Sequence, residues 1–466
     1  MQPYELTLTA AAGAIADKSL SPVELVESVL SRGEETEGIV HAFATLTPEA
    51  ARSSAAQAER DIQAGRYRGP LHGIPFALKD IIDTAGVPTM AGSRVWAGRI
   101  PGENSAVMTR LTSAGAVLVG KAHTHEFAYG LITPQTINPW LADRIAGGSS
   151  GGSAVAVAAG SATFSIGTDT AGSVRVPAAL NGVVGLKPSY GLVSRHGVAP
   201  LSWSLDHVGP ITRSVRDAAL VLDAITGRDP RDPASIDSPN SHHEVGRSTD
   251  LRGVRVGIPG NYFFDHVTPE IEKAVRNSVD HLAELGAKTI EVAVPLTDYL
   301  LPTLWGHMGP EAASAHEQHL KQHANLFGED VRTLLEAGQL VLAGDYLRAQ
   351  RSRTCIRQAW RELFRTIDVL AAPSVACTAI RRDQSDVLWG DGSTETATDT
   401  LVRLTAPANI TGLPALSLPI GLDEQGLPIG LQLIADQLAE PDLLRIGIAY
   451  ETAHDSSGHL ARGICG

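Results

Sequence analysis

Hydrophobic residues recur along the chain with two periods, that of a helix and that of a strand. Helical spacing covers 22–30, 48–65, 105–111, 218–225, 269–286, 300–350 and 443–450. Short apolar runs that favour strands lie between these stretches, at 71–79, 115–121, 184–188, 254–258, 289–294, 369–373, 414–419 and 427–434. This alternation, without an internal repeat, predicts that residues 1–466 form a single large α/β domain with a mixed central sheet flanked by helices.

Two helix starts are marked by capping residues. Ser21 can cap a helix, Pro22 suits the first helical position, and Glu24 completes a capping box. Ser214 precedes a helical pattern that ends at Ile225. The first signal predicts a helix that begins at Pro22, and the second predicts that residues 214–217 cap a helix from Ala218 to Ile225.

Four other segments have patterns that predict their structure. The apolar run from Ala154 to Gly167 is too short to span a bilayer and predicts a buried helix. Segment 206–210 predicts a loop, and the polar segment 229–250 predicts a surface loop or a linker within the domain. Arginines at a spacing of four, from Arg353 to Arg365, lie opposite an apolar face and predict a helix with a solvated basic side.

Two loops rich in glycine and serine surround the apolar run. The first is Gly147-Gly-Ser-Ser-Gly-Gly-Ser153, and the second is Gly167-Thr-Asp-Thr-Ala-Gly-Ser173. Glycine is used where the backbone turns sharply or passes close to a ligand. A serine flanked by glycine has its hydroxyl beside exposed backbone N–H groups. This combination suits a nucleophile next to an oxyanion site.

The residues of these loops leave two other interpretations open. Gly-Ser stretches are most often flexible loops, although both of these return at once to apolar sequence. Residues 147–151 also match the Gly-x-Ser-x-Gly elbow of α/β hydrolases. That elbow follows an apolar strand, whereas residues 138–144 are loop-like.

A lysine, Lys79, ends the apolar run 71–79. Its ammonium group could extend from the surface, or the side chain could be buried with a lowered pKa and act as a base. Apolar neighbours such as Phe76 and Leu78 favour burial. Because side chains alternate along a strand, we expect Asp80 to point away from Lys79.

Two motifs are weak. Gly115 to Lys121 resembles a phosphate-binding loop, but Ala122 replaces the required serine or threonine. His123 and His125 could bind a metal, yet no third spaced ligand stands out. We therefore expect no bound metal.

Composition narrows the class of protein further. The net charge of −13 makes nucleic acid an unexpected partner, because an acidic surface repels phosphates. The three scattered cysteines, Cys355, Cys377 and Cys465, suggest neither a disulfide framework nor a zinc site. The amino terminus has no basic segment typical of a secretory signal. We expect a cytoplasmic protein that does not contact a membrane.

Several motifs in order resemble the amidase signature family. They are 147–153, 167–177 with Val-Arg-Val-Pro177, Val184-Gly-Leu-Lys-Pro188, Pro70-Leu-His-Gly-Ile-Pro75 leading to Lys79-Asp80, 409–419 and Gly426-Leu-Pro-Ile-Gly-Leu-Gln432. The resemblance covers nearly the whole chain. It implies one α/β/α domain, and hydrolysis of a carboxylic amide to an acid and ammonia or an amine through an acyl-enzyme.

The resemblance also implies roles for individual residues. Ser173 would be the nucleophile, Ser149 the bridging serine and Lys79 the base, with a cis peptide between Gly148 and Ser149. The expected oxyanion donors are the N–H groups of Thr170, Ala171, Gly172 and Ser173. Weaker expectations place Tyr129, Gly148 and Ser150 at the substrate. No metal or organic cofactor is implied, and a homodimer is one expected assembly.

One position departs from the family pattern, and the substrate stays open. The family usually has glycine where this chain has Ala171, which keeps its N–H but narrows the choice of backbone conformation. An alternative function is that of the A subunit of glutamyl-tRNA amidotransferase, a glutaminase. That glutaminase has an aspartate five positions before the equivalent of Pro407, where Val402 stands here. A second alternative is a binding protein with the same fold and no activity.

Overall fold

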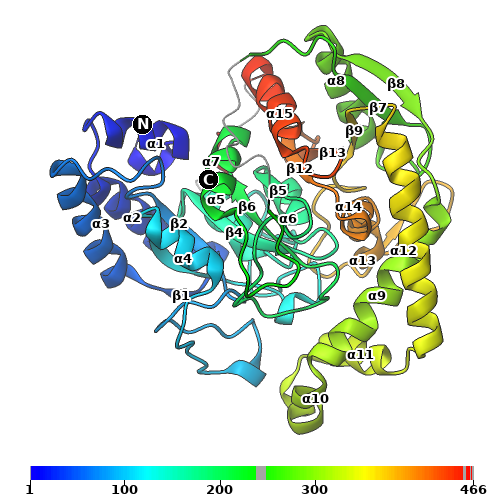
Figure 1. Cartoon of the computed structure of the whole chain (residues 1–466), viewed down its shortest axis with the longest axis horizontal. Coiled ribbons are helices and arrows are strands. Elements are labelled where there is room, and N and C mark those ends of the chain that lie inside the picture. Colours follow the sequence, from blue (N-terminus) through cyan, green and yellow to red (C-terminus); the bar gives the residue numbers. More distant parts are fainter. Residues whose placement is uncertain (1, 238–247, 455–457, 462, 464–466) are drawn as a thin grey trace.

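An eleven-stranded mixed sheet runs through the molecule, in the order β1-β3-β2-β4-β6-β5-β12-β13-β9-β7-β8 (Figure 1). The computed structural model describes residues 2–237, 248–454, 458–461 and 463. The strands of this sheet are β1 (Phe43–Leu46), β2 (Pro75–Lys79), β3 (Val117–Ala122), β4 (Phe164–Asp169), β5 (Val184–Lys187), β6 (His207–Thr212), β7 (Arg255–Pro259), β8 (Lys288–Val292), β9 (Val369–Pro373), β12 (Ala415–Leu422) and β13 (Pro428–Ala435). A separate hairpin pairs β10 (Asp386–Leu388) with β11 (Thr394–Thr396).

The directions of the strands confirm a mixed sheet. Strand β2 runs parallel to both β3 and β4, and β7 runs parallel to both β8 and β9. The other pairs, from β4–β6 through β13–β9, are antiparallel, as is β1–β3. Parallel neighbours end at the same edge of a sheet, so the carboxyl ends of β2 and β4 lie together.

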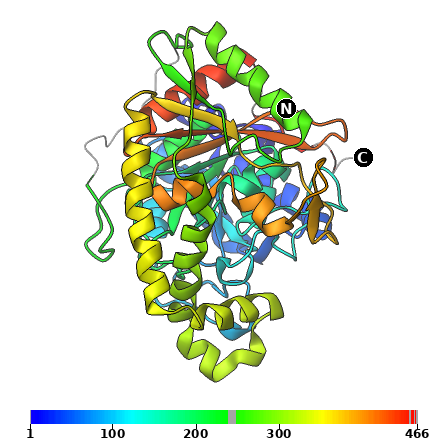
Figure 2. The same cartoon turned by 90° about the vertical axis from the view of Figure 1, so that its right-hand side faces the viewer.

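Helices cover both faces of the sheet. They are α1 (Leu8–Ala16), α2 (Pro22–Val40), α3 (Pro48–Gln63), α4 (Ala106–Ser113), α5 (Gly151–Ala159), α6 (Arg175–Asn181), α7 (Val215–Ile225), α8 (Pro269–Glu284), α9 (Leu300–Ala315), α10 (Glu317–His323), α11 (Glu329–Gln339), α12 (Ala343–Phe364), α13 (Ala397–Val402), α14 (Ala406–Thr411) and α15 (Glu440–His454). Helices α5 and α6 pack on one face, and α7, α8 and α15 pack on the other. Helices α9 to α12 form an elongated group whose far end, α10 and α11, extends away from the sheet (Figures 1 and 2).

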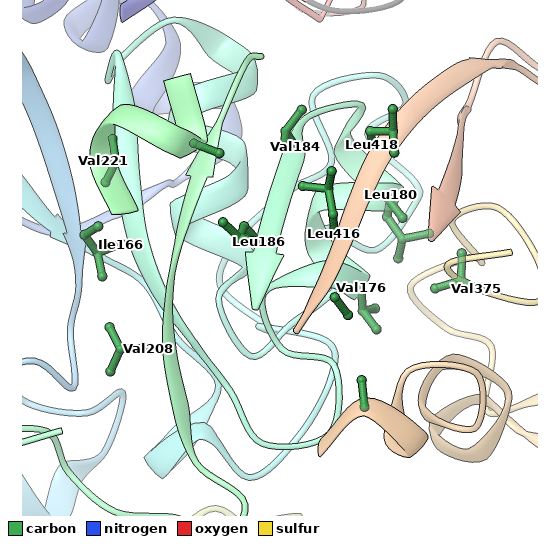
Figure 3. Close-up of a cluster of buried hydrophobic side chains, with 14 of the residues drawn as sticks. Ile166, Val176, Leu180, Val184, Leu186, Val208, Val221, Val375, Leu416 and Leu418 are labelled. Carbon is green, nitrogen blue, oxygen red and sulfur yellow. The ribbon is translucent and has the colours of Figure 1, made fainter. Parts of the chain in front are cut away.

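The core is built from small and aliphatic side chains. Figure 3 shows part of it, where Ile166, Leu186, Val208 and Leu416 lie on neighbouring strands of the sheet centre and are buried. All nine residues of α5 are buried. A helix of glycine, alanine and valine can lie close to a sheet, and it carries the first glycine-serine loop at its amino end.

The capping signals are confirmed. Ser21 accepts a hydrogen bond from the Glu24 N–H, and the Glu24 carboxylate accepts one from the Ser21 N–H, so α2 begins with a capping box. Ser214 caps α7 by accepting from the N–H of Asp217. Local chemistry is sufficient to predict both helix starts, because the capping serines accept hydrogen bonds from N–H groups that have no acceptor within the helix.

Two segments differ from their predictions. The run from Ala154 to Gly167 is a helix and a strand, because α5 ends at Ala159, the next residue is Gly160, whose φ of 82° favours glycine, and β4 begins at Phe164. Segment 206–210, predicted as a loop, belongs largely to β6, which is buried between β4 and β5. Sheet pairing outweighs the local signals of Gly209 and Pro210 there.

The arginine-rich segment is helical, but its basic side is not uniformly solvated. Arg361 and Arg365 are exposed. Arg353 is half-buried and donates to the carbonyl oxygens of Ile410 and Ser204, at 2.8 and 2.7 Å. The amino-terminal part of this side of α12 therefore binds α14 and the segment that precedes β6.

Parts of two predictions lie outside the described residues. Residues 238–247 belong to the predicted loop or linker 229–250, and Cys465 is one of the three cysteines. The described residues 229–237 include Asp229 and Asp232, which are buried. The prediction for 229–250 stays a prediction.

Among the described residues, no helix combines the length and the hydrophobicity needed to cross a bilayer.

Candidate active site

The carboxyl ends of β2 and β4 place a lysine beside a threonine. Phe76 and Leu78 of β2 pair with Phe164 and Ile166 of β4, so the ends of the two strands lie side by side. At that edge Lys79 Nζ donates to Oγ1 of Thr168 at 2.8 Å. Lys79 is completely buried. Loops at the carboxyl ends of strands commonly carry ligand sites in α/β proteins.

The first glycine-serine loop places Ser149 at the lysine. Lys79 Nζ lies 2.7 Å from Ser149 Oγ, and Ser149 is also completely buried. The peptide bond between Gly148 and Ser149 is cis, as the resemblance implies. Thr133 donates from its Oγ1 to the Ser149 carbonyl oxygen at 3.2 Å and accepts from the Gly151 N–H at the same distance. These contacts hold the loop in one position at the amino end of α5.

The second loop places Ser173 in the turn between β4 and α6. Gly172 has a φ of +135°, and a Cβ there would collide with the Thr405 side chain, so only glycine fits. Asp169, at the end of β4, accepts from the N–H groups of Gly172 and Val174, at 2.8 and 3.2 Å. Ser173 is 3% exposed, and its carbonyl oxygen accepts from the Ser150 N–H at 3.2 Å. The two glycine-serine loops are thus in contact, as a shared site requires.

A buried ion pair holds the Ser173 turn. Arg175 donates to both oxygens of Asp169 at 3.0 Å, and both side chains are completely inaccessible to solvent. Arg175 also donates to the side chains of Asn409 and Gln432, each at 2.6 Å. Burial alone would raise the pKa of Asp169, but the Arg175 guanidinium outweighs it and holds that pKa well below its usual range.

We expect Arg175→Met to lower the free energy of unfolding by about 3–5 kcal/mol, because it leaves the Asp169 carboxylate buried without its cation. Urea unfolding followed by circular dichroism measures the change. Arg365→Met is the matched control, since Arg365 forms an exposed pair with Glu362 and its loss should not be measurable. Equal losses in the two variants would contradict a special role for the buried pair.

Burial lowers the pKa of Lys79 to about 7, although Asp169 and Asp206 oppose the shift. A lysine with this pKa is partly neutral near neutral pH and can accept a proton. Asp80 points away, as strand alternation predicts, and lies 3.7 Å from Lys121 Nζ while accepting from the Met90 N–H. It therefore does not pair with Lys79.

Three of the four expected oxyanion donors have no acceptor. Within the described part of the chain, the N–H groups of Thr170, Ala171 and Ser173 make no hydrogen bond. Gly172 differs from the prediction, because its N–H donates to Asp169 and is unavailable to a ligand. Ala171, the departure from the family pattern, does not have the positive φ that would require glycine.

A cavity of about 480 Å³ opens onto Ser173. Its wall includes Thr170 and Ala171, which precede Ser173 in the same turn. The remaining walls are mainly apolar, and they come from the segment after β3, from α9, α11 and α13, and from one loop: Ala128, Tyr129, Gly130, Leu131, Ile132, Leu201, Trp305, Met308, Leu334 and Val402. Two carboxylates, Asp330 and Asp399, complete it together with His125, Thr396 and Thr398.

Of the three weaker substrate-binding candidates, one lines the cavity and two do not. Tyr129 lines the cavity, and burial raises the pKa of its hydroxyl to about 12, so it stays neutral. Gly148 and Ser150 are not among the described residues of the wall. Ser150 instead donates from its Oγ to the Thr168 carbonyl oxygen at 3.1 Å, and Gly148 packs against the backbone of 131–132. Both support the loop behind the cavity.

Sequence reasoning did not find Thr168 or most of the cavity wall. Thr168 stands within the second motif, and its contact with Lys79 depends on the pairing of β2 with β4. Trp305 and Met308 lie on α9, where helical spacing alone gave no sign of a site. Only the packing of α9 and α11 over the Ser173 turn brings these residues together.

The two histidines that the sequence analysis considered as possible metal ligands do not form a metal site with their described neighbours. His125 Nε2 lies 3.1 Å from a carboxylate oxygen of Asp330, and burial lowers the pKa of His123 to about 4. No group of three or more metal-binding side chains occurs in the described ranges.

Comparisons with known proteins agree with this geometry. The family model described as "Amidase" matches residues 24–444. An "Amidase" of Pseudomonas putida is 45% identical over 450 residues, which cover 96% of each chain. The glutamyl-tRNA(Gln) amidotransferase A subunit of Chloroflexus aurantiacus is 42% identical over 479 residues and also covers 96% of each chain. The crystal structure of a bacterial aryl acylamidase of the amidase signature family superposes with a TM-score of 0.88, at 27% identity and 96% coverage of both chains.

Proposed function

The chain belongs to the amidase signature family and is an amide-hydrolysing enzyme, and on this premise we propose that Ser173, Ser149 and Lys79 carry out its chemistry. One observation carries the proposal: the buried Lys79 Nζ lies 2.7 Å from Ser149 Oγ, in the loop that contacts the Ser173 turn. A serine hydroxyl is a weak nucleophile and needs a base. A lysine whose pKa is about 7 is suited to that role.

In the first half of the reaction, Ser173 Oγ attacks the amide carbonyl carbon. Its proton passes to Ser149 Oγ as the Ser149 proton passes to neutral Lys79. The N–H groups of Thr170, Ala171 and Ser173 stabilise the charge on the carbonyl oxygen. The proton then returns from Lys79 through Ser149 to the leaving nitrogen, the C–N bond breaks, and an acyl-enzyme remains on Ser173.

In the second half, water takes the place of the leaving amine. Lys79 and Ser149 remove a proton from the water as its oxygen attacks the acyl carbon. The bond between that carbon and Ser173 Oγ breaks, and the proton returns to Ser173 Oγ. The products are a carboxylic acid and free enzyme, and no cofactor takes part.

The walls of the cavity that opens onto Ser173 favour an uncharged, apolar acyl group. Leu131, Trp305 and Met308 offer apolar contacts, and among the described residues of the wall there is no lysine or arginine. The carboxylates of Asp330 and Asp399 disfavour an anionic substrate. We infer that small alkyl and aryl amides are better substrates than amides that carry a carboxylate.

A screen for ammonia release over aliphatic, aryl and carbamoyl amides tests this function. We expect turnover of apolar amides and little turnover of amides of dicarboxylic acids. Absence of turnover of every amide by folded protein would contradict the proposed function.

A glutaminase of the amidotransferase type is the second candidate, because relatives with that name are 38–42% identical to the chain. Recognition of the glutamine α-carboxylate favours an arginine or lysine in the wall, and the described wall has neither. Val402, which stands where that glutaminase has an aspartate, lines the cavity. Glutaminase activity, or co-purification with two further proteins of such a complex, would support this candidate instead.

We expect a chelator to leave activity unchanged, because the proposed proton transfers use only Ser173, Ser149 and Lys79. The measurement is the hydrolysis rate before and after dialysis against EDTA. A loss that one specific metal ion restores would contradict this expectation and would direct attention to His123 and His125.

Two further proposals concern the setting of the enzyme. Assembly as a homodimer is tested by sedimentation at several protein concentrations. A cytoplasmic location is supported by the cysteine pattern, and fractionation of cells that express the protein tests it.

A further inference from the structure

A second cavity, of about 270 Å³, adjoins the first. Ala128, Thr170 and Leu201 line both cavities, so the two meet at Thr170, in the Ser173 turn. Ligand pockets usually have volumes of about 300–1,000 Å³, so the smaller cavity suits part of a substrate rather than a whole one.

The two cavities contact different parts of the catalytic group. Ser173 and Ala171 line only the larger cavity. Thr168, whose Oγ1 accepts from Lys79 Nζ, lines only the smaller one. The smaller cavity therefore opens on the lysine side of the site, the larger cavity opens on the side of the nucleophile Ser173, and Thr170 lies between the two.

From this arrangement we propose that the smaller cavity binds the amine side of the substrate and that the enzyme accepts N-aryl amides. The proposal rests on the function proposed above. The leaving nitrogen must receive its proton through Ser149 from Lys79, so its substituent must extend toward the lysine side. The acyl group then occupies the larger cavity.

The walls of the smaller cavity specify the chemistry of the amine. Near Thr168 they are apolar, formed by Ile81, Val198, Ala199 and Val208. Trp203 forms part of the rim, with 61% of its surface exposed. An exposed tryptophan beside an apolar cavity suits stacking against an aromatic ring.

The charges in this wall already have partners. Arg195 pairs with Asp232 at 3.0 Å, and Arg231 pairs with Asp229 at 2.9 Å. Asp206 accepts from Thr170 Oγ1 at 2.7 Å and from the Leu201 N–H at 3.0 Å. It therefore holds in place two of the residues that line both cavities. The cavity therefore favours an uncharged aromatic amine such as aniline over a charged one.

The same cavity would allow acyl transfer to an added amine. Aniline nitrogen attacks the acyl carbon on Ser173, and a C–N bond forms. The bond from that carbon to Ser173 Oγ breaks, and the aniline proton passes through Ser149 and Lys79 to Ser173 Oγ. The reaction is the reverse of acylation by an anilide and needs no other reactant.

The experiment compares phenylacetamide with phenylacetanilide in three variants. We expect Val198→Trp, which fills the smaller cavity, to lower kcat/KM for the anilide at least about tenfold more than for the primary amide. Leu334→Trp is the matched control in the wall of the larger cavity and should affect both substrates equally. Trp203→Ala, at an exposed position that is safe for folding, should lower kcat/KM for the anilide alone, by about threefold to tenfold.

A second readout does not depend on the absolute rate. With phenylacetamide as the acyl donor and aniline added, the ratio of anilide to acid should fall in Val198→Trp and stay unchanged in Leu334→Trp. Anilide selectivity in Leu334→Trp instead would overturn the assignment of the two cavities. Hydrolysis of the primary amide with none of the anilide would overturn this inference alone, whereas failure of both substrates would reject the proposed function itself.

Discussion

Ser173→Ala should reduce kcat for amide hydrolysis by about 10⁶-fold, the scale seen when a serine nucleophile that acts with its partners is removed. The remaining residues can still bind the substrate and polarise its carbonyl group, but no acyl-enzyme can form. The measurement is kcat under saturating amide, with circular dichroism to confirm that the variant is folded. Because Ser173 packs in a turn held by Asp169, loss of one hydroxyl should leave the fold intact.

A fluorophosphonate probe separates the nucleophile from its neighbours. The parent enzyme should be labelled at Ser173, and Ser173→Ala should not be labelled. Ser153→Ala is the matched control, because Ser153 belongs to the first glycine-serine loop but makes only a 3.4 Å hydrogen bond to the Ile166 carbonyl oxygen. Labelling of Ser173→Ala at Ser149 or Ser150 would show that the nucleophile was assigned to the wrong residue.

Local sequence signals predicted what depends on local chemistry. The capping residues and apolar runs located most of the helices and strands because they act within a few residues. The glycine-flanked serines and the lysine at the end of an apolar strand indicated a candidate site, and the resemblance to the amidase signature family implied the separate roles of Ser173, Ser149 and Lys79. Lys79 and Ser149 are 70 residues apart in sequence, and the structure places their side chains 2.7 Å apart.

Features that depend on pairing or packing between distant segments could not be predicted. Thr168 contacts Lys79 only because β2 and β4 are parallel neighbours. The Gly172 N–H is unavailable as an oxyanion donor because it donates to the Asp169 carboxylate. The sequence of the motif does not show which N–H group that carboxylate contacts. The wall of the cavity comes from α9, α11 and α13, whose helical patterns show only which faces are apolar.

The activity should rise with pH and level off above about pH 7, because Lys79 must be neutral to accept a proton. Burial lowers the pKa of this lysine from 10.5 to about 7. Below pH 7 the neutral fraction, and with it kcat/KM, should fall about tenfold for each pH unit. An uncharged amide with a rate-limiting acylation step is the substrate for this profile, so that the substrate itself does not titrate.

Lys79→Ala should lower kcat by about 10²–10⁴-fold, the usual contribution of a general base, and should abolish the rise near pH 7. Lys79→Arg should not restore activity, because a guanidinium remains protonated at every pH used. The measurement is the pH profile of kcat/KM for the parent and both variants, with the same uncharged amide.

Lys121→Met is the control for another buried lysine. Burial lowers the pKa of Lys121 to about 8, and its Nζ donates to the Ile82 carbonyl oxygen and to Thr89 Oγ1, at 2.8 and 2.5 Å. Its loss should lower thermal stability, because Asp80 loses its cation, but should leave the midpoint of the activity profile in place. An active Lys79→Arg enzyme, or a profile flat from pH 5 to 9 in the parent, would show that Lys79 only positions the bridging serine.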